Sequence, residues 1–425
     1  MKKNNLSYIF NKNEEEIIFI SNKDFIQKEI NTLLTIKISK IIIIFFSILF
    51  IIFNKDKQYL RWKSLIKSIK YMNFCLGDIL INKNNIKLFS QINITVIIPV
   101  YNCEKTIRAS IRSIQNQNFL NFEILLVNDF SKDNSLNIIE EMQKEDFRIK
   151  IIKNQKNRGT LYSRCIGTLQ AKGKYIVPLD NDDLFMNGDI FYIAFNEAEI
   201  GKYDILDFNA IRGPNYKFHL SQMIDDIFHD NPNNIVLHQP ELSQHSIIKN
   251  GIYRVNNIHL WGKCIRTKIY KKAVNLLGKK KYSYFVCWAE DTAIVFILFN
   301  IASSYKYISN YGVFHLMSGI TACFTQSNKN KLFGEIFLLE IILYFSKNDF
   351  KSKKYILIKI FEIINSPFFE NGIKNDENRQ YLNKVFNKII ICNFITKEDK
   401  EIILNLMKKF FVTANLSGLF FKLKL

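Results

Sequence analysis

The 425-residue sequence has few of the residues that build fibrous, disulfide-rich or zinc-binding proteins. It has only 15 glycines and 6 prolines, which excludes a collagen-like or low-complexity chain. Its seven cysteines are scattered and no two form a C-x-x-C pair, which argues against a zinc module and against a disulfide-stapled small domain. Acidic residues are also scarce, 39 against 59 basic ones, but 48% of the residues are hydrophobic, enough for a large core.

The formal net charge of +20 does not by itself indicate a nucleic-acid partner. Lys, Asn, Ile and Phe are all abundant, as they are in chains shaped by AT-rich coding, so the lysine excess needs no binding partner to explain it. The sequence contains no known nucleic-acid-binding module and no platform of interleaved aromatic and basic residues. We therefore expect no nucleic-acid partner.

One long apolar run lies near the N-terminus. Residues 41–53 read IIIIFFSILFIIF, and extension back to residue 36 gives 18 residues with Lys37 and Lys40 near one end. The run comes too late for a signal peptide, and it has no polar face of the kind that a surface helix needs. We expect a single membrane-spanning anchor at 36–53, with a buried helix or strand as the alternative.

The sequence thereby divides into an anchored N-terminal region, an α/β domain and a helical tail. The expected parts are an N-terminal tail (1–35), the anchor (36–53), a basic stem (54–90), an α/β domain (91–325) and a helical C-terminal region (326–425). The expected location is a membrane, in the Golgi or endoplasmic reticulum if the chain is eukaryotic. Similar numbers of basic residues flank the anchor, so the side of the membrane that holds the α/β domain stays open.

From about residue 92 onward, short apolar runs alternate with longer helical stretches. Strands are expected at 94–100, 122–129, 149–154, 174–183 and 204–211, and helices at 103–116, 135–144 and 160–171. Alternation of this kind, with strands rich in Val, Ile and Leu, predicts an α/β, Rossmann-like fold with a mainly parallel sheet and helices on both faces.

Acidic side chains gather where the fourth predicted strand ends. The residues there are Asp180, Asn181, Asp182 and Asp183. Ligands of an open parallel sheet bind beyond the carboxyl ends of its strands, so this run lies at the expected site. Carboxylates this close repel one another, and a hard divalent cation such as Mg²⁺ or Mn²⁺ relieves the repulsion. The run predicts a metal site, although Asp and Asn also cluster in turns.

A second acidic pair occurs in WAEDTAIVF, where Glu290 and Asp291 precede an apolar helix. Acids in a first helical turn are stabilised by the helix dipole, which is one interpretation of the pair. The other interpretation is a general base at the start of the helix, facing the metal site.

A basic stretch without an intervening acid comes before this pair. Its members are Lys263, Arg266, Lys268, Lys271, Lys272, Lys279, Lys280 and Lys281. We interpret the stretch as a solvated helix face, with a surface that binds diphosphate, an anionic acceptor or lipid headgroups as the alternative.

Taken together, these motifs resemble those of glycosyltransferase family 2. The stretches that carry the resemblance are IIPVYNCEKTI, LLVNDFSKDNS, NRGTLYSRCIGTLQAKGKYIVPLDNDD and the ED of WAEDTAIVF, in the family's order over about residues 94–320. The resemblance implies the GT-A fold and a hexosyltransferase-like, inverting reaction. It also implies a nucleotide-sugar donor, a UDP-sugar by preference, a divalent cation (Mn²⁺ or Mg²⁺), and a glycan, lipid or protein acceptor.

The resemblance also implies roles for single residues. Asp291 matches the family's catalytic base, with Glu290 beside it, and would take a proton from the acceptor hydroxyl. Asp182 matches a metal ligand, and His315 in FHLMSGIT would approach the metal or the diphosphate, unless it is a loop histidine without a role. The residues that match the nucleotide-sugar site are Pro99, Val100, Tyr101, Glu104, Asn128, Asp129, Arg164, Asp180 and Asn181.

The chain departs from the family pattern at three positions. Asn128 stands where the first of two paired acids is usual, Phe130 stands where a glycine is usual, and Cys165 replaces an asparagine. The alternative function is therefore a catalytically inactive carbohydrate- or nucleotide-binding protein on the same fold. A phosphatase with an Asp nucleophile fits less well, because Leu184 stands where that chemistry expects Thr or Val.

Overall fold

A computed structural model of the chain describes seven stretches of it. They are residues 91–213, 235–239, 259–316, 326–345, 350–391, 396–398 and 400–405. The expected tail, anchor and stem (1–90) lie outside the described residues. Within the described stretches, no helix is long and apolar enough to cross a membrane.

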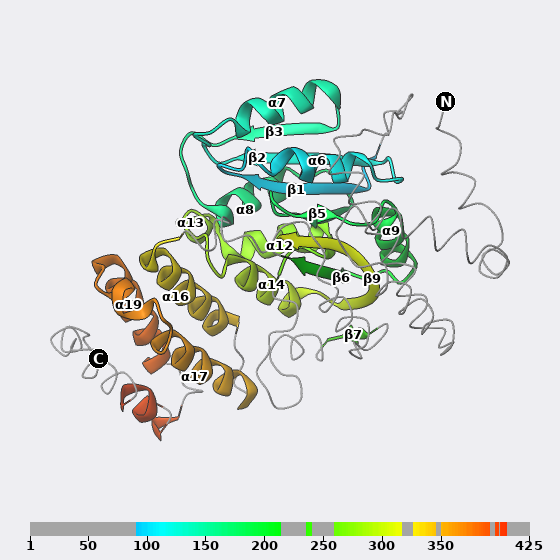
Figure 1. The fold of residues 1–425 in the computed structure, drawn as a ribbon. Helices are drawn as coiled ribbons and strands as arrows, with labels where there is room; N and C mark the ends of the chain where they lie inside the picture. The colour runs from blue at the N-terminus through cyan, green and yellow to red at the C-terminus, as the bar shows by residue number, and fades with distance from the viewer. Residues whose placement is uncertain are drawn as a thin grey trace, which may run out of the picture. The chain divides into compact units, whose positions relative to one another are not determined.

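The first half of the sheet is parallel, as the sequence predicts. Its strands are β1 (Ile94–Val100), β2 (Phe122–Asn128), β3 (Ile149–Lys153) and β4 (Tyr175–Pro178), side by side in the order β3-β2-β1-β4 (Figure 1). The helices that connect them are α6 (Ile107–Gln115), α7 (Ser135–Glu145) and α8 (Thr160–Gln170). Because Val100 pairs with Asn128, β1 and β2 end at the same edge of the sheet.

The second half of the sheet is mixed. Its strands are β5 (Leu184–Phe185), β6 (Ile205–Gly213), β7 (Val236–His238), β8 (Lys263–Arg266) and β9 (Ser304–Leu316). β8 runs antiparallel to both β4 and β6, β6 runs parallel to β9, and β5 and β7 run antiparallel to β9. The antiparallel pairings were not expected, because strands of two to four residues such as β5, β7 and β8 are too short to show a clear period.

Helices cover both faces of the sheet, as predicted. Successive residues of a strand point to opposite faces, so Ile97 and Ile98 of β1 enter different hydrophobic clusters. Ile98 packs in the cluster that contains the apolar residues of α6, α7 and α9 (Ile190–Ile200). Ile97 packs in the cluster that contains residues of α8, α12 (Thr267–Leu277) and α14 (Glu290–Ile301).

The C-terminal helices continue this second cluster. They are α16 (Asn328–Phe345), α17 (Phe350–Ile364), α18 (Phe369–Ile373) and α19 (Asp376–Ile391). Ile336 and Phe337 of α16 and Val385 of α19 are buried in the same cluster as the apolar side of α14. The helical region and the α/β region therefore share one hydrophobic core on this face of the sheet.

Candidate active site

The acidic run after β4 forms a tight turn instead of extending the strand as predicted. The Asp183 N–H donates to the Asp180 carbonyl at 3.2 Å. The Asn181 side-chain amide donates to the Pro99 carbonyl at 2.9 Å, and the Ser110 hydroxyl donates to the Asn181 carbonyl at 2.9 Å. The end of β1 and helix α6 thus hold the turn in place, and Asn181 acts here through contacts within the protein.

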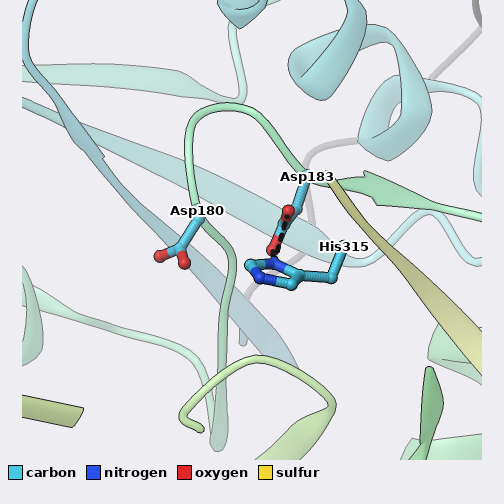
Figure 2. A group of neighbouring side chains, drawn as sticks. All are labelled: Asp180, Asp183 and His315. Atoms are coloured by element: carbon cyan, nitrogen blue, oxygen red, sulfur yellow. Dashed lines mark hydrogen bonds and ion pairs between the residues drawn. The ribbon is translucent and has the colours of Figure 1, made fainter. Parts of the chain in front are cut away.

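Three side chains at this turn could hold a metal ion. Asp180, Asp183 and His315 each offer one ligand atom, and these atoms all lie within 4.8 Å of one another (Figure 2). His315 Nδ1 lies 3.0 Å from Asp183 Oδ1, and the Leu316 N–H donates to the same oxygen at 3.0 Å. Two carboxylates and one imidazole suit a divalent cation such as Mn²⁺. By their chemistry, the residues present fit the cation that the sequence implied.

Asp182, the metal ligand that the sequence suggests, is not one of these three residues. Burial and the nearby charges of Asp183 and Asp180 raise the pKa of Asp182 to about 8. Crowded acids of this kind favour either protonation or a bound cation. Asp183 was predicted only as a member of the acidic run, and no sequence signal distinguished it from Asp182 as the candidate ligand.

Two kinds of contact hold the His315 ring: Asp183 binds its Nδ1, and aromatic rings stack on its face. Burial would lower the pKa of His315, but the carboxylate of Asp183 outweighs burial and raises the pKa to about 9. The Trp261 ring stacks on the His315 ring with centroids 5.0 Å apart, and His259 stacks on Trp261 at 4.5 Å. Sequence reasoning missed Trp261 and His259, whose only signal is their place near the basic stretch. Stacking and the Asp183 contact together fix the direction in which the imidazole points.

Arg164 connects the acidic turn to the second acidic pair. Its side chain, on α8, is only 3% exposed. Its Nη2 lies 2.6 Å from Asp180 Oδ1 and 3.1 Å from Asp291 Oδ1. Nε and Nη1 are buried and have no hydrogen-bond partner among the described residues. A buried guanidinium with two unused donors beside a metal-type cluster is suited to an anionic ligand.

Glu290 and Asp291 form the first turn of α14, as the sequence predicts. Burial raises the pKa of Asp291 to about 6 even though Arg164 acts in the opposite direction. Burial and the charge of Asp291 raise the pKa of Glu290 to about 8. Of the two neighbouring carboxyls, Asp291 thus favours the charged form, beside Arg164, and Glu290 favours the protonated form. The Leu260 N–H, 3.4 Å from Asp291 Oδ2, is a further contact to the carboxylate.

Asp129, expected at the nucleotide, makes its contacts within the protein. Its carboxylate accepts hydrogen bonds from the Asn154 side chain at 2.8 Å and from the Arg158 and Gly159 N–H groups at 2.9 and 2.7 Å. Gly159 has φ +86°, a left-handed conformation that favours glycine. Asp129 thus holds the loop that leads into α8 and Arg164.

Two further predicted residues also make contacts within the loops at this edge. Asn128 Oδ1 accepts from the Ser131 N–H at 3.3 Å, and Glu104 Oε2 accepts from the Asn134 N–H at 3.0 Å. Both contacts order the loop between β2 and α7.

Exposed aromatic side chains lie at the carboxyl ends of β1 and β2. Tyr101, which directly follows the buried Val100, is 37% exposed. Phe130 is 40% exposed. Its φ of +65° is a left-handed conformation, which the glycine usual at this position in the resembled family would adopt without strain. Lys132 Nζ lies 3.6 Å from the centroid of the Phe130 ring. Aromatic faces at this edge are suited to stack on a planar base.

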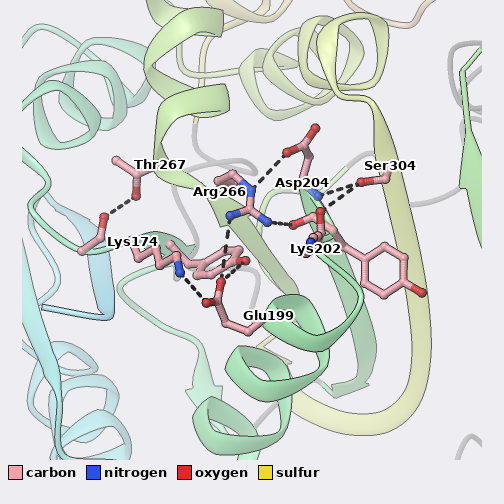
Figure 3. A network of polar contacts seen from close by, with 10 residues as sticks. Lys174, Glu199, Lys202, Asp204, Arg266, Thr267 and Ser304 are labelled. Carbon is pink, nitrogen blue, oxygen red and sulfur yellow. Dashed lines mark hydrogen bonds and ion pairs between the residues drawn. The ribbon is translucent and has the colours of Figure 1, made fainter.

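The basic stretch differs from its interpretation as a solvated face. Lys263 is 1% exposed and pairs with Asp207 at 3.2 Å, and Arg266 pairs with Asp204 at 3.1 Å. Figure 3 shows Arg266 within a network that also includes Glu199 of α9. These acids come from α9, from β6 and from the residue directly before β6, far away in the sequence. The members that are exposed, as expected, are Lys268, Lys272, Lys279 and Lys280.

Residues 95–250 match the family model for glycosyl transferase family 2. An uncharacterized glycosyltransferase of Haemophilus influenzae is 45% identical over 91 residues, which are 21% of this chain and 28% of the relative. The GalNAc(5)-diNAcBac-PP-undecaprenol beta-1,3-glucosyltransferase of Campylobacter jejuni is 35% identical over 96 residues, 22% of this chain and 31% of the relative.

The UDP-Glc:alpha-D-GlcNAc-diphosphoundecaprenol beta-1,3-glucosyltransferase WfgD of Escherichia coli is 32% identical over 126 residues. That match covers 28% of this chain and 49% of the relative, so the chain spans less than half the length of each of these three relatives. A crystal structure of S. aureus TarS 1-349 in complex with UDP-GlcNAc shares the fold, with a TM-score of 0.53 and 18% identity. That likeness covers 78% of this chain and 90% of the other.

Proposed function

Because residues 95–250 match the family model for glycosyl transferase family 2, we propose that the chain is an inverting glycosyltransferase. It moves a sugar from a nucleotide-sugar donor to an acceptor hydroxyl. The observation that carries this proposal is the position of Arg164, in contact with both Asp180 and Asp291. This one guanidinium brings a candidate base and a candidate metal cluster into a single site.

Asp291 is the general base in this proposal. It is charged at neutral pH because its pKa, although raised by burial, is about 6. A base with a pKa near the working pH combines the correct protonation state with a useful affinity for the proton. Asp291 accepts the proton of the acceptor hydroxyl while that oxygen attacks the anomeric carbon. Glu290 remains protonated and adds no second negative charge to the base.

Asp180, Asp183 and His315 are the residues that would hold a divalent cation. When bound, such a cation supplies positive charge against the departing nucleoside diphosphate. Asp182 remains a further candidate ligand. The unused donors of Arg164 are a second source of positive charge beside the same group.

The nucleotide lies at the ends of β1 and β2 in this proposal. Tyr101 stacks on the base. Pro99 and Val100, the last two residues of β1, hold Tyr101 at the edge of the sheet. Asn128, Asp129 and Glu104 support the site by ordering its loops. A UDP-sugar is favoured as the donor because the name of the Escherichia coli relative contains UDP-Glc.

A lipid-linked glycan is the favoured acceptor. Two relatives are named as acting on sugars carried by undecaprenol through a diphosphate. An acceptor of this kind is held at a membrane, which agrees with an anchor at 36–53 followed by the stem, the catalytic domain at 91–325 and the helical region.

The test incubates the full chain with Mn²⁺ and each of a set of nucleotide-sugars. The measured quantity is the rate at which the donor is hydrolysed or its sugar is transferred. Asp291→Asn removes the base and lowers turnover by at least about a hundredfold, whereas the donor Kd changes less than about threefold. Glu197→Gln is the control, because it removes a carboxylate from α9 that pairs only with Lys306 among the described residues. An equal loss of donor binding in Asp182→Asn and Asp291→Asn contradicts the division of roles. Donor binding without turnover in the wild type favours an inactive binding protein.

A further inference from the structure

We infer that the C-terminal helices position the catalytic base, and that Glu335 of α16 is a positioning residue that acts through Trp288. This inference rests on the proposed function, because it assigns the helical region a task in the same site. The segment concerned is the E-D turn, defined as residues 288–291, which leads into α14.

The indole of Trp288 is the first point of contact. Its Nε1–H donates to Glu335 Oε1 at 2.8 Å. Glu335 Oε2 in turn lies 2.6 Å from Nζ of Lys359 on α17, and both side chains are less than 15% exposed. Hydrogen bonds to a charged carboxylate are short and geometrically specific, so these contacts orient the indole ring. The indole, two residues before Glu290, is thus tied to two C-terminal helices.

Backbone packing is the second point of contact. A Cβ atom at Gly334 would lie 2.1 Å from the carbonyl oxygen of Trp288 and 2.9 Å from its carbonyl carbon. No real Cβ atom tolerates such distances, so α16 approaches the Trp288 peptide as closely as only glycine permits. The helix therefore contacts the main chain of the E-D turn as well as its side chain.

The indole ring is also enclosed by the helical region. Phe368 packs edge-on against Trp288 with ring centroids 5.7 Å apart. Lys331 Nζ, from the first turns of α16, lies 5.2 Å from the centroid of the same ring. With Gly334 and Glu335 of α16, these residues enclose Trp288 from two parts of the helical region, α16 and the start of α18.

Ala289 shows why the turn needs such support. It has φ +58°, a left-handed conformation that is unfavourable for a residue with a Cβ atom. A residue in this conformation persists only where its surroundings impose it. The segment before it is fixed at a second point by the Val286 carbonyl, which accepts the Leu161 N–H of α8 at 3.1 Å. Ala289 thus directly follows a segment that is anchored at both Val286 and Trp288.

The position of Ala289 connects this support to catalysis. Glu290 and Asp291 follow it directly, so a change in its backbone angles would redirect both carboxylates. A displacement of about 1 Å at a reacting group can cost about a hundredfold in rate. The helical region therefore contributes to turnover without touching the donor.

A matched control is available on the same helix. Glu340 of α16 is 2% exposed and accepts hydrogen bonds from the Tyr381 hydroxyl at 2.7 Å and from Lys388 Nζ at 2.5 Å. Its contacts lead to α19 and to Lys281, not to the E-D turn. Removal of the Tyr381 hydroxyl disturbs the same helix bundle without removing a contact to Trp288.

The experiment compares full-chain Glu335→Leu, Trp288→Phe, Glu335→Gln and Tyr381→Phe with the wild type. We expect Glu335→Leu and Trp288→Phe to lower kcat at least about tenfold, with donor KM and Kd within about threefold. Glu335→Gln retains an acceptor for the indole and keeps kcat within about threefold of the wild type. Tyr381→Phe lowers the melting temperature but leaves kcat unchanged. Amide hydrogen exchange at residues 286–291 is faster in Glu335→Leu than in Tyr381→Phe.

The outcomes separate the two proposals. If the wild type turns over a donor but Glu335→Leu and Trp288→Phe keep full kcat, the inference is overturned and the proposed function stands. An equal fall of kcat in Tyr381→Phe also overturns it, because any damage to the bundle would then suffice. If the wild type turns over no donor, the proposed function fails together with the catalytic part of the inference. Unchanged exchange at residues 286–291 in Glu335→Leu removes the structural part as well.

Discussion

Nη2 of Arg164 lies 3.1 Å from Oδ1 of Asp291, and the same nitrogen lies 2.6 Å from Asp180. One buried cation thus touches a carboxylate from each of the two acidic motifs. The positive charge of Arg164 stabilises the charged form of Asp291. Burial alone would raise the pKa of Asp291 further. The two motifs therefore act on one another through Arg164.

Replacement of Arg164 tests this bridge. Lys offers a single ammonium in place of a planar fork, so Arg164→Lys cannot reproduce both contacts. We expect turnover to fall by about a hundredfold, and the acid limb of the kcat/KM–pH profile to move to higher pH, because an ammonium that pairs with Asp180 no longer offsets the burial of Asp291. Unfolding in denaturant checks that the variant is folded. An unchanged acid limb would show that Arg164 does not influence the base.

The pH dependence of the wild type provides a second test. Asp291 must be charged to accept a proton, and its pKa is raised by burial to about 6. We therefore expect kcat/KM to fall as the pH drops through about 6, whereas an ordinary Asp would stay charged to about pH 4.

Glu290→Gln serves as the control for this profile. Burial and the charge of Asp291 raise the pKa of Glu290 to about 8, so Gln imitates the protonated form that this shift favours near neutral pH. The acid limb near 6 should persist in this variant. Its disappearance would assign the limb to Glu290 and remove Asp291 from the role of base.

Metal binding tests the cluster at the acidic turn. We expect Asp183→Asn and His315→Gln each to raise the Mn²⁺ Kd at least about tenfold, measured by calorimetry on the full chain. Asp182→Asn should have a smaller effect, because its carboxylate is not among the three clustered ligand atoms. A loss confined to Asp182→Asn would instead support the assignment made from the sequence motif.

The role of Asp129 can be separated into support and direct binding. Its carboxylate accepts three hydrogen bonds from the loop before α8, and Asn would set an amide N–H₂ against one or more of these donors. We expect Asp129→Asn to lower the free energy of unfolding by about 1–3 kcal/mol.

The donor affinity of this variant completes the test. At a temperature where Asp129→Asn is folded, the donor Kd should stay within about threefold of the wild type, because the carboxylate supports the loop. A tenfold weaker donor without loss of stability would place Asp129 directly on the nucleotide.

The sequence by itself determined the parallel half of the sheet and the location of the two acidic motifs. β1 coincides with the predicted strand, because seven consecutive buried residues of ITVIIPV are a purely local signal. The helix of WAEDTAIVF begins at Glu290, because acids favour a first turn and an apolar run continues it. Both are decided by neighbours in the chain, which a sequence displays directly.

Only the tertiary structure decided which side chains meet. It placed Asp183 with His315, joined Asp180 to Asp291 through Arg164, and set Glu335 on Trp288. These partners come from elements far apart in the sequence and carry no shared period or spacing. The contact of Asp183 with His315 arises from the pairing of β5 with β9, and the other two arise from the packing of α8, α14 and α16 in one hydrophobic core. Both are properties of the folded chain and not of any local segment.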